Sequence, residues 1–505
     1  MQLFVVPTRF CADFHCGRTL LRKRVTCGGS APADKCEQLV GPIAKSSAHA
    51  YRWNILVVVI GTKILPGRVD SRAETSVFDA WKKEARELAA RQELVTKASR
   101  DDLRKALIEL DTLFRNAPGS VHKAYRNLTE KRIEDARESF TGAIGDGHLS
   151  WSLSDETPEL AAVRMGGLIR ELDRALADRR SHWPIAPSEW HVEQLRCWFI
   201  PRQGVSALRP ARRLQAYSKR GLLFHRILPS VIQGYPVQVV DTRTLHSTAP
   251  DVSEWKMGAC LFKPLELEPE FCSTEGDKRF IISGIEVPLA EDTISQQISQ
   301  ALKENCIAIV WPELTVSPEL REKILKLVRD RDITDELEAP EILIPGTWHE
   351  TTDRGIVNRA RIYNGYGEER LIYDKIAPYA DDGWGTEKIA AGDRVCVLAT
   401  EGALIGIAIC LDFCDVCETP FSELDVDVML VPSMGNDRTM HGHQITAAQG
   451  EVRFGTRSFV VQHPTQTALK DHRIGSVLPL LKEPSAVSLE ELGQKSVWAA
   501  YKWGP

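Results

Sequence analysis

The chain has 505 residues, which is too long for one compact domain and indicates two or three. Its hydrophobic content of 43% and charged content of 26% are typical of a globular protein. A net charge of -5 excludes any whole-chain case for a nucleic-acid or acidic-membrane binder.

No stretch approaches the roughly 18 apolar residues of a membrane span, and the N-terminus lacks the pattern of a secretory signal. We therefore expect a cytoplasmic protein whose twelve cysteines are reduced. Residues 1–73 are expected to be irregular. Their four cysteines match no paired zinc pattern in their spacing: Cys11, Cys16, Cys27 and Cys36.

From residue 74 to about residue 140, apolar residues recur at three- and four-residue steps, which predicts helices. Ser99 stands at a good N-cap position, and the segment 116–119 breaks the run. Another helix fits 159–177. We therefore expect a mainly helical module over 74–255, of unknown role.

Residues 183–275 combine tryptophans with many prolines and are expected to be packed but irregular. Basic residues cluster from Arg202 to Arg226, interleaved with Tyr217 and Phe224. Such a pattern is able to grip a phosphate backbone. A solvated helix face beside acidic neighbours explains it more simply, so nucleic-acid binding stays an open alternative for this stretch only.

From Lys278 onward, strands and helices alternate, which predicts an α/β layered domain over 278–505. Helices are expected at 293–303, 318–329 and near 445–453; Ser317 caps the second one, and a proline follows it. Strands are expected at 280–285, 306–310, 341–347, 359–364, 371–374, 395–399, 403–410, 426–432 and 458–462.

Three reactive side chains stand at the ends of these strands: Glu313 after Trp-Pro, Lys375 after Tyr-Asp, and Cys410 after Gly-Ile-Ala-Ile. Taken singly, each has an ordinary explanation, because solvated carboxylates and lysines and small buried cysteines are common. Their order and context say more. The chain resembles the nitrilase (carbon–nitrogen hydrolase) superfamily, whose signatures are Pro-Glu, Tyr-x-Lys and Cys-x-Asp or Cys-x-Glu, each following an apolar strand or a glycine turn.

A fourth residue, Glu387, resembles the second glutamate of that superfamily. The resemblance implies a four-layer α-β-β-α sandwich in the C-terminal half and a cysteine hydrolase that acts on a non-peptide carbon–nitrogen bond. It also implies a homodimer or larger assembly and no metal or organic cofactor. Leu411-Asp412 after the cysteine is closer to the amidase branch than to the nitrile-cleaving branch, which has Trp-Glu. The segment 449–453 departs from the family's Arg-Ala-x-Glu helix motif.

The chemistry explains why these residue types belong together. A thiol is mostly protonated at neutral pH, so Cys410 needs a base, and Glu313 is expected to take its proton and later return it to the leaving ammonia. Lys375 and the backbone N–H after Cys410 would stabilise the oxyanion, while Glu387 would hold Lys375 charged and oriented. Water would then hydrolyse the thioester of an amide, carbamoyl or nitrile substrate.

Two alternatives stay open. Cys410, Cys414 and Cys417 have the Cys-x3-Cys-x2-Cys spacing of radical SAM enzymes, which hold a [4Fe–4S] cluster. The position of the motif argues against this reading, because few residues follow it. Alternatively, the domain is a non-catalytic sensor or interaction protein, and the helical module is the working part.

Overall fold

The computed structural model describes residues 3–4, 58–59, 71–95, 97–153, 157–178, 187–201, 222–242, 255–262, 264–274, 277–330, 339–381, 383–400, 403–414, 419–464, 475–478 and 498–503. The chain divides into two compact units, Met1–Ser71 and Arg72–Pro505. In the first, β1 (Leu3–Phe4) pairs antiparallel with β2 (Val58–Val59). The four N-terminal cysteines lie outside the described residues.

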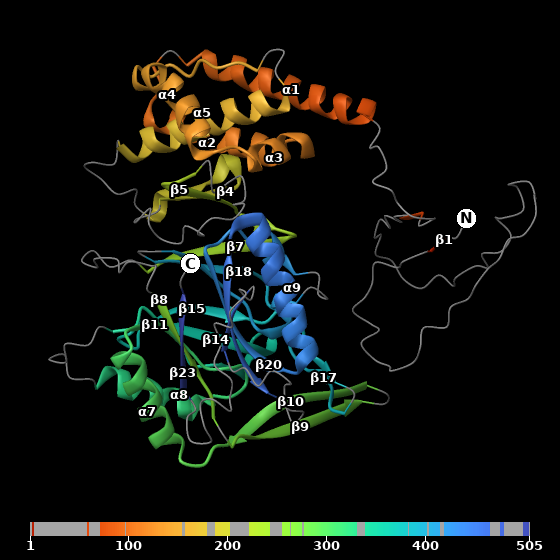
Figure 1. Cartoon of the computed structure of the whole chain (residues 1–505). Coiled ribbons are helices and arrows are strands. Elements are labelled where there is room, and N and C mark those ends of the chain that lie inside the picture. The colour runs from red at the N-terminus through yellow and green to blue at the C-terminus, as the bar shows by residue number, and fades with distance from the viewer. Residues whose placement is uncertain are drawn as a thin grey trace, which may run out of the picture. The chain divides into compact units, whose positions relative to one another are not determined.

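The second unit begins with five helices, which Figure 1 shows gathered together. They are α1 (Ser71–Glu93), α2 (Arg100–Arg115), α3 (Gly119–Arg126), α4 (Glu130–Gly145) and α5 (Pro158–Asp178). The predicted start of α2 is confirmed. Ser99 accepts a hydrogen bond from the backbone N–H of Asp102, and the Asp102 carboxylate accepts one from the backbone N–H of Ser99.

Residues 187–201 and 222–242, which we expected to be irregular, contain short strands. They are β3 (His191–Val192), β4 (Cys197–Pro201), β5 (His225–Pro229), β6 (Val231–Ile232) and β7 (Tyr235–Asp241). The expectation was wrong here because the strands are short and β4 pairs with β5 across residues distant in the sequence. A turn joins β6 to β7 through Gly234, whose φ of 88° favours glycine.

Strands and helices alternate from residue 277 onward, as the sequence predicts, whereas the strands Trp255–Cys260 and Glu266–Thr274 fall in the stretch that was expected to be irregular. The helices are α7 (Ala290–Lys303), α8 (Pro318–Arg329) and α9 (Asp437–Phe454). The strands are β8 (Trp255–Cys260), β9 (Glu266–Thr274), β10 (Asp277–Glu286), β11 (Cys306–Val310), β12 (Ile342–Ile344), β13 (Thr347–Thr352), β14 (Gly355–Tyr363), β15 (Glu369–Asp374), β16 (Ala380–Asp381), β17 (Gly385–Glu387), β18 (Val395–Ala399), β19 (Leu404–Ile407), β20 (Val428–Gly435), β21 (Arg457–Pro464), β22 (Gly475–Leu478) and β23 (Trp498–Trp503).

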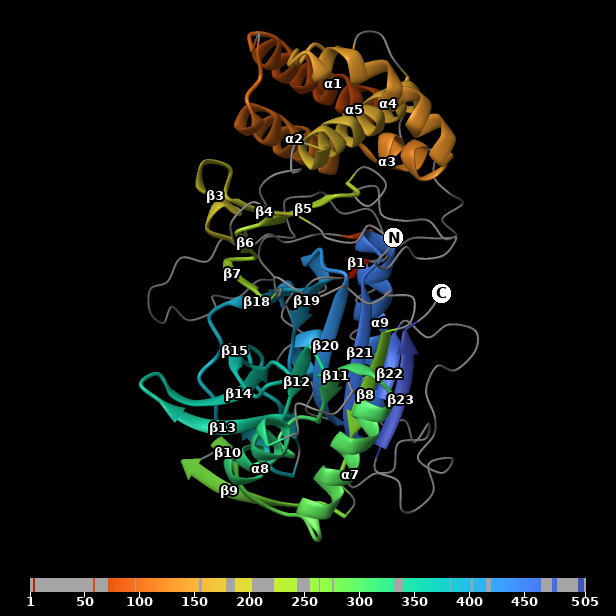
Figure 2. The same ribbon diagram turned by 90° about the vertical axis from the view of Figure 1, so that its left-hand side faces the viewer.

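Two seven-stranded sheets organise this part of the chain (Figure 2). One has the order β13-β14-β12-β11-β8-β23, with β15 paired to β14, and the other has the order β22-β21-β20-β19-β18-β7-β6. Strands from before residue 278 join both sheets. β8 pairs parallel with β11, and β7 pairs parallel with β18. A smaller sheet, β16-β17-β10-β9, lies beside them.

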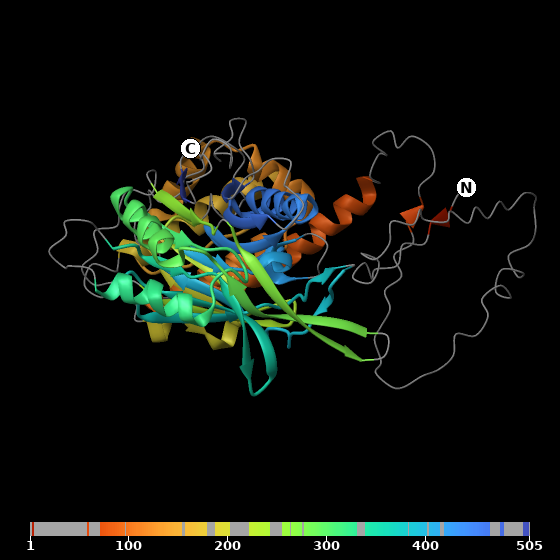
Figure 3. The same cartoon turned by 90° about the horizontal axis from the view of Figure 1, so that it is seen from below.

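The core fills the space between the two sheets and continues among the helices. Buried residues of β11, β12 and β14 pack in one cluster with those of β18 to β21. The opposite side of the β11 sheet packs against α7 and α8, through residues such as Ile298, Ile324 and Leu343. Helix α9 contacts β21 and β20. In Figure 3, the green helices α7 and α8 lie to the left of the blue helix α9.

Two features bear on the expected partners. No helix within the described part of the chain is long and apolar enough to span a membrane. Arg226, at the end of the basic stretch, is fully buried and donates to Asp427 Oδ1 at 2.7 Å. It is therefore unable to contact a phosphate backbone, and most of that stretch lies outside the described residues.

Candidate active site

The four candidate residues lie at or directly after the ends of strands. Glu313 follows β11, Lys375 follows β15, Glu387 ends β17, and Cys410 begins a short 3-10 helix (Cys410–Phe413) after β19. All four side chains are buried, none more than 3% exposed. The structure gathers the two glutamates around the lysine, and the main chain of β20 joins this group to the cysteine.

Lys375 lies between the two carboxylates. Its Nζ is 2.7 Å from Glu313 Oε1 and 2.7 Å from Glu387 Oε2. Burial alone would lower the pKa of Lys375, but the charges of Glu313 and Glu387 outweigh it and raise that pKa well above its usual value. Burial would likewise raise the pKa of Glu387, but Lys375 and His349 hold it below its usual range. The lysine is therefore charged.

Two further residues, which the sequence did not predict, form hydrogen bonds with this group. Asn358 Nδ2 donates to Glu313 Oε1 at 2.9 Å and to Glu387 Oε1 at 2.7 Å. His349 Nδ1 accepts from the backbone N–H of Ile282, so its Nε2 carries the proton that is donated to Glu387 Oε1 at 2.9 Å. His349 and Asn358 stand opposite each other on β13 and β14. The only signal in the sequence was a polar residue at a buried position of each strand.

Cys410 adopts a left-handed backbone conformation with φ of 46°, which is unusual for a residue with a side chain. Its thiol donates to the backbone carbonyl of Met434 at 3.3 Å. Burial is the main reason why the pKa of Cys410 lies well above its usual value, and the Glu313 charge adds to this. Lys375, Ser433 and the Met434 backbone oppose the rise. Cys410 is therefore a thiol at rest and needs a base to become a nucleophile.

The main chain of Met434, on β20, lies between the candidate base and the candidate nucleophile. Its N–H donates to Glu313 Oε2 at 3.2 Å, while its carbonyl accepts from the Cys410 thiol. One residue of a largely buried strand, itself half-buried, thus holds both side chains. This arrangement fixes the position of Glu313 relative to Cys410 without a direct hydrogen bond between them in the resting state.

Asp412 is the second residue after Cys410, and it holds the segment that carries Lys375. Its carboxylate accepts from the backbone N–H of Ile376 at 3.1 Å, from that of Ala377 at 2.7 Å and from the Tyr373 hydroxyl at 2.6 Å. Burial raises the pKa of Asp412 to about 6, although these hydrogen bonds lower it. In the sequence, Asp412 indicated only that the substrate is closer to an amide than to a nitrile. Its contacts show that it also positions the segment that carries Lys375.

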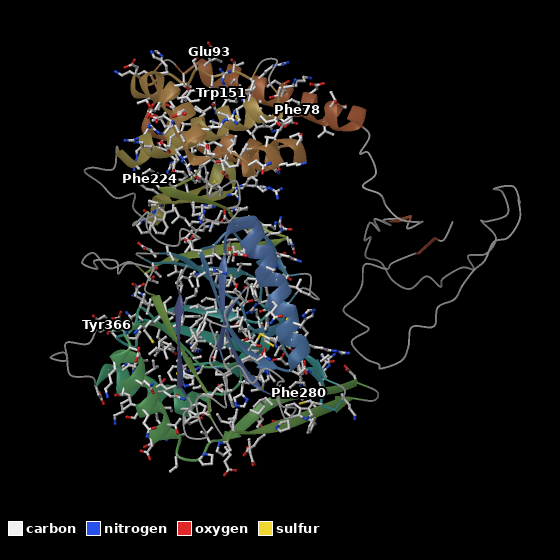
Figure 4. The ribbon with its side chains drawn as sticks, in the orientation of Figure 1. Phe78, Glu93, Trp151, Phe224, Phe280 and Tyr366 are labelled. Atoms are coloured by element: carbon white, nitrogen blue, oxygen red, sulfur yellow. The ribbon has the colours of Figure 1, made fainter. Side chains whose placement is uncertain are left out.

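A small apolar cluster adjoins the site. It consists of Phe280, Ile282, Leu314 and Trp348, with Leu267, Ile285, Tyr379, Trp384 and Met434 packed against it. Several members are direct neighbours of site residues: Leu314 follows Glu313, and Trp348 precedes His349. Figure 4 labels Phe280 on β10, where the cluster lies. Apolar side chains therefore adjoin the polar group formed by the four residues.

A separate hollow of about 570 Å³ lies on the other side of Asp374, the residue before Lys375, and contains none of the four candidates. Its arginines are Arg354, Arg359, Arg370 and Arg394, and its acids are Asp353, Glu369, Asp374 and Asp393. The equal numbers of the two charges, joined by ion pairs such as Arg359–Asp374, give it no preference for an anion.

The cysteines of the alternative cluster motif have different surroundings. Cys410 faces Met434, whereas Cys414 Sγ lies 3.4 Å from His443 Nδ1. Cys417 is outside the described residues. Among the residues that are described, no group of three or more His, Cys, Asp or Glu side chains is arranged to hold a metal ion.

Comparison with solved structures finds amidases among the neighbours. An amidase from Nesterenkonia sp. aligns over 50% of this chain and 91% of its own, with 15% identity and a TM-score of 0.35. An alanine mutant of the Nesterenkonia AN1 enzyme, described as from the nitrilase superfamily, aligns over 51% of this chain and 93% of its own, with the same identity and TM-score.

A further structure of that amidase shows covalent addition of the acetamide moiety of fluoroacetamide at its active-site cysteine. It aligns over 51% of this chain and 94% of its own, with 15% identity and a TM-score of 0.35. No sequence-family model and no curated protein matches the chain. At this level of identity, the function of the chain has to be argued from its own residues.

Proposed function

We propose that the chain is a carbon–nitrogen hydrolase in which Cys410 is the nucleophile, Glu313 the general base and acid, Lys375 the oxyanion partner and Glu387 the residue that orients Lys375. The observation that carries the proposal is the pair of 2.7 Å contacts of Lys375 Nζ with the two glutamates, beside a buried thiol that shares Met434 with Glu313. Acid, base, cation and nucleophile of an acyl-transfer reaction thus converge in one place.

The reaction begins with a neutral thiol. Glu313 takes the thiol proton as Sγ attacks the carbonyl carbon, and the oxyanion forms against Lys375 and the backbone N–H of Leu411. Glu313 then gives the proton to the leaving nitrogen, so that ammonia or an amine departs and a thioester remains on Cys410. Water attacks the thioester with Glu313 again as base, which releases the acid and restores the thiol.

The substrate is proposed to be a small amide without a negative charge. The site already holds two carboxylates against one ammonium group, so a further anion would be repelled. The neighbouring side chains Leu314, Trp348 and Met434 favour an apolar acyl group. Leu411-Asp412 also favours an amide over a nitrile.

Intact-mass measurement tests this proposal. The full chain is incubated with a panel of small amides and nitriles, and the acyl group is expected to replace the thiol hydrogen of Cys410 while ammonia is released. Cys410→Ala should show neither event and should keep its fold by circular dichroism. If iodoacetamide modifies Cys410 but no amide or nitrile forms an adduct or releases ammonia, the chain is not a hydrolase of this class.

We also propose that helices α7 and α8, the two large sheets and α9 form a four-layer α-β-β-α sandwich, and that two or more chains assemble through it. Helices on the outer face of each sheet support the layering. Light scattering tests the assembly at micromolar concentration, where a dimer would give twice the 56.5 kDa of one chain. A mass of one chain would contradict it.

A further inference from the structure

A buried hydrogen-bond chain runs from Cys410 to helix α9, and the proposed mechanism does not use it. Ser433 is fully buried and precedes Met434 on β20, whose carbonyl accepts from the Cys410 thiol. The Ser433 side chain is one of the groups that hold the pKa of Cys410 down, by a hydrogen bond. The same hydroxyl oxygen lies 3.0 Å from His443 Nε2 and 3.4 Å from Gln462 Oε1. His443 and Gln462 are fully buried as well.

The contacts of His443 fix its tautomer. Its Nδ1 lies 2.9 Å from the carbonyl of Phe413, and a carbonyl only accepts, so Nδ1 carries the proton. Cys414 Sγ lies near the same nitrogen, at 3.4 Å. Burial lowers the pKa of His443 to about 4, so the ring is neutral at physiological pH. His443 Nε2 must then accept, and Ser433 is the donor beside it.

Gln462 presents a second acceptor to the same hydroxyl. Its Nε2 donates to the carbonyl of Asn436 at 3.2 Å, which leaves Oε1 directed at Ser433. Ser433 has one hydroxyl proton, and three groups are able to accept it: His443 Nε2, Gln462 Oε1 and a Cys410 thiolate. With a neutral thiol, the shortest of these contacts, to His443, takes the proton. Once the thiolate forms, its negative charge makes it the strongest acceptor of the three.

We propose that Ser433 is the hydrogen-bond donor to the Cys410 thiolate, and that His443 positions Ser433 by holding its hydroxyl proton until the thiolate forms. The pair sets how readily the nucleophile is generated. This inference deepens the proposed function and rests on it only in taking Cys410 as the nucleophile. Ser433 touches the reacting sulfur, whereas His443 acts through Ser433 and is a positioning residue.

Other charged groups near the thiol are already accounted for. Glu313 and Lys375 both act on Cys410, in opposite directions, and neither contacts Ser433 or His443 by a hydrogen bond among the described residues. The described contacts of His443 are all with uncharged groups: Phe413, Cys414 and Ser433. Substitutions at Ser433 and His443 therefore change the equilibrium between the thiol and the thiolate of Cys410 without removing a charged partner.

The test measures the rate at which iodoacetamide alkylates Cys410 in the full chain at pH values between 6 and 10. The mass of the peptide that contains Cys410 reports the extent of alkylation. Sulfur displaces iodide in this reaction, and only the thiolate reacts. Ser433→Ala should slow alkylation at pH 7 by about tenfold and shift the profile to higher pH, because a donor to a charged atom is lost. Ser433→Thr keeps the hydroxyl and should stay close to the unmodified chain.

His443→Leu should have the opposite effect. Removing the competing acceptor frees the Ser433 proton for the thiolate, so alkylation should speed up by about threefold and the profile should shift to lower pH. In the double variant with Ser433→Ala, His443→Leu should produce no acceleration, because its effect passes through Ser433. If His443→Leu does not fold, Gln462→Met removes the other acceptor and should also accelerate alkylation.

The two substitutions are expected to change the alkylation rate in opposite directions, which a merely structural role of Ser433 and His443 would not produce. If Ser433→Ala and His443→Leu both slow alkylation, or if His443→Leu changes the rate equally with and without Ser433, the inference is overturned. The proposed function fails separately. If the rates change in the predicted directions while no amide yields an acyl adduct, the inference about Ser433 and His443 is supported and the proposed hydrolase function is contradicted. If adducts form normally but the rates do not change in those directions, the hydrolase function is supported and the inference is overturned.

Discussion

Two buried groups of charged side chains lie in the same compact unit, and they differ in how their charges are satisfied. The Lys375 cluster comprises Glu313, Lys375, Glu387, Asn358 and His349. The Arg226 cluster comprises Arg226, Asp425, Asp427, Arg115 and Asp111, and it joins α2 and β5 to the loop before β20.

In the Lys375 cluster, all four carboxylate oxygens accept hydrogen bonds of 2.7 to 3.2 Å. In the Arg226 cluster, Arg226 Nη1 lies 3.7 Å from Asp425 Oδ1, and neither atom has a hydrogen-bond partner among the described residues. Short, directional bonds therefore reach every carboxylate oxygen of the Lys375 cluster, whereas the Arg226 cluster combines 2.7 Å bonds, such as that from Arg226 Nη2 to Asp427 Oδ1, with a longer ion pair that only compensates charge. The first cluster is therefore suited to chemistry and the second to holding segments of the chain together.

The largest expected effect follows from breaking the Lys375 cluster. Glu313→Gln keeps the shape of the side chain but removes the base, so amide turnover should fall by about a thousandfold. Lys375→Met should reduce turnover by a similar factor while Cys410 remains open to alkylation, because the oxyanion loses its charged partner.

Glu387→Gln is expected to have a smaller effect than Glu313→Gln and Lys375→Met and serves as the comparison for both. It should affect alkylation less than Glu313→Gln, since Glu387 contacts Lys375 and shows no contact with the Met434 backbone that adjoins Cys410. Single-turnover alkylation rates measured beside ammonia release check the ordering. Near-normal turnover in Glu313→Gln would remove the case for a catalytic unit.

Breaking the Arg226 cluster should lower stability and leave the chemistry of the surviving folded protein unchanged. Arg226→Met removes the cation that pairs with Asp427 at 2.7 Å and leaves Asp425 with Arg115 as its ion-pair partner, so the free energy of unfolding should fall by about 3–5 kcal/mol in urea titration. Adding Asp427→Asn to this variant should restore part of the loss. Lys323→Met removes an exposed pair with Glu291 and, as a matched control, should cost less than about 1 kcal/mol. Equal losses in the two single variants would contradict the distinction.

Asp412 tests whether hydrogen bonds alone compensate a buried carboxylate, since no cation contacts it directly. Its pKa is about 6 in the fold against 3.8 as the ordinary value, so between these pH values the fold holds a proton that the unfolded chain has lost. This contribution to stability is present below pH 3.8 and is lost as pH rises through 6, a change of about 3 kcal/mol. Asp412→Asn should abolish that difference. If the free energy of unfolding changes by the same amount between pH 4 and pH 7 in the unmodified chain and in Asp412→Asn, the pKa of Asp412 is not raised.

The smallest effect is expected at Cys414. Its thiol contacts His443 Nδ1 and the backbone carbonyls of Cys410 and Thr439. Cys414→Ala should therefore retain at least about half of the amide turnover, measured as ammonia release. If activity vanished and a coloured, cluster-bearing protein turned colourless, the iron–sulfur interpretation would replace the hydrolase.

The sequence could predict the residues that stand at strand ends, because an apolar run that stops at a reactive side chain is visible locally. Glu313, Lys375 and Cys410 belong to this kind, and so do the bounds of β11 and α8. His349 and Asn358 could not be found in this way. They lie inside strands, and their importance depends on the register of β13 against β14.

The same limit applies to Ser433, His443 and β7. Ser433 and His443 meet because β20 and α9 pack together, a contact that no short motif encodes. β7 lies in the stretch that was expected to be irregular, and its parallel pairing with β18, more than 150 residues later, depends on the whole fold. Long-range pairing of this kind leaves no local pattern.

The place of β7 beside β18 also bears on how the protein may be shortened. A chain that begins at residue 278 would lack β7 and β8, so the backbone N–H and C=O groups of β18 and β11 that these strands pair with would face water along open sheet edges. Exposed apolar edges of this kind invite pairing between molecules. Expression of such a fragment should therefore give aggregates, and any transplant of the site into another protein has to carry residues 235–260 with it.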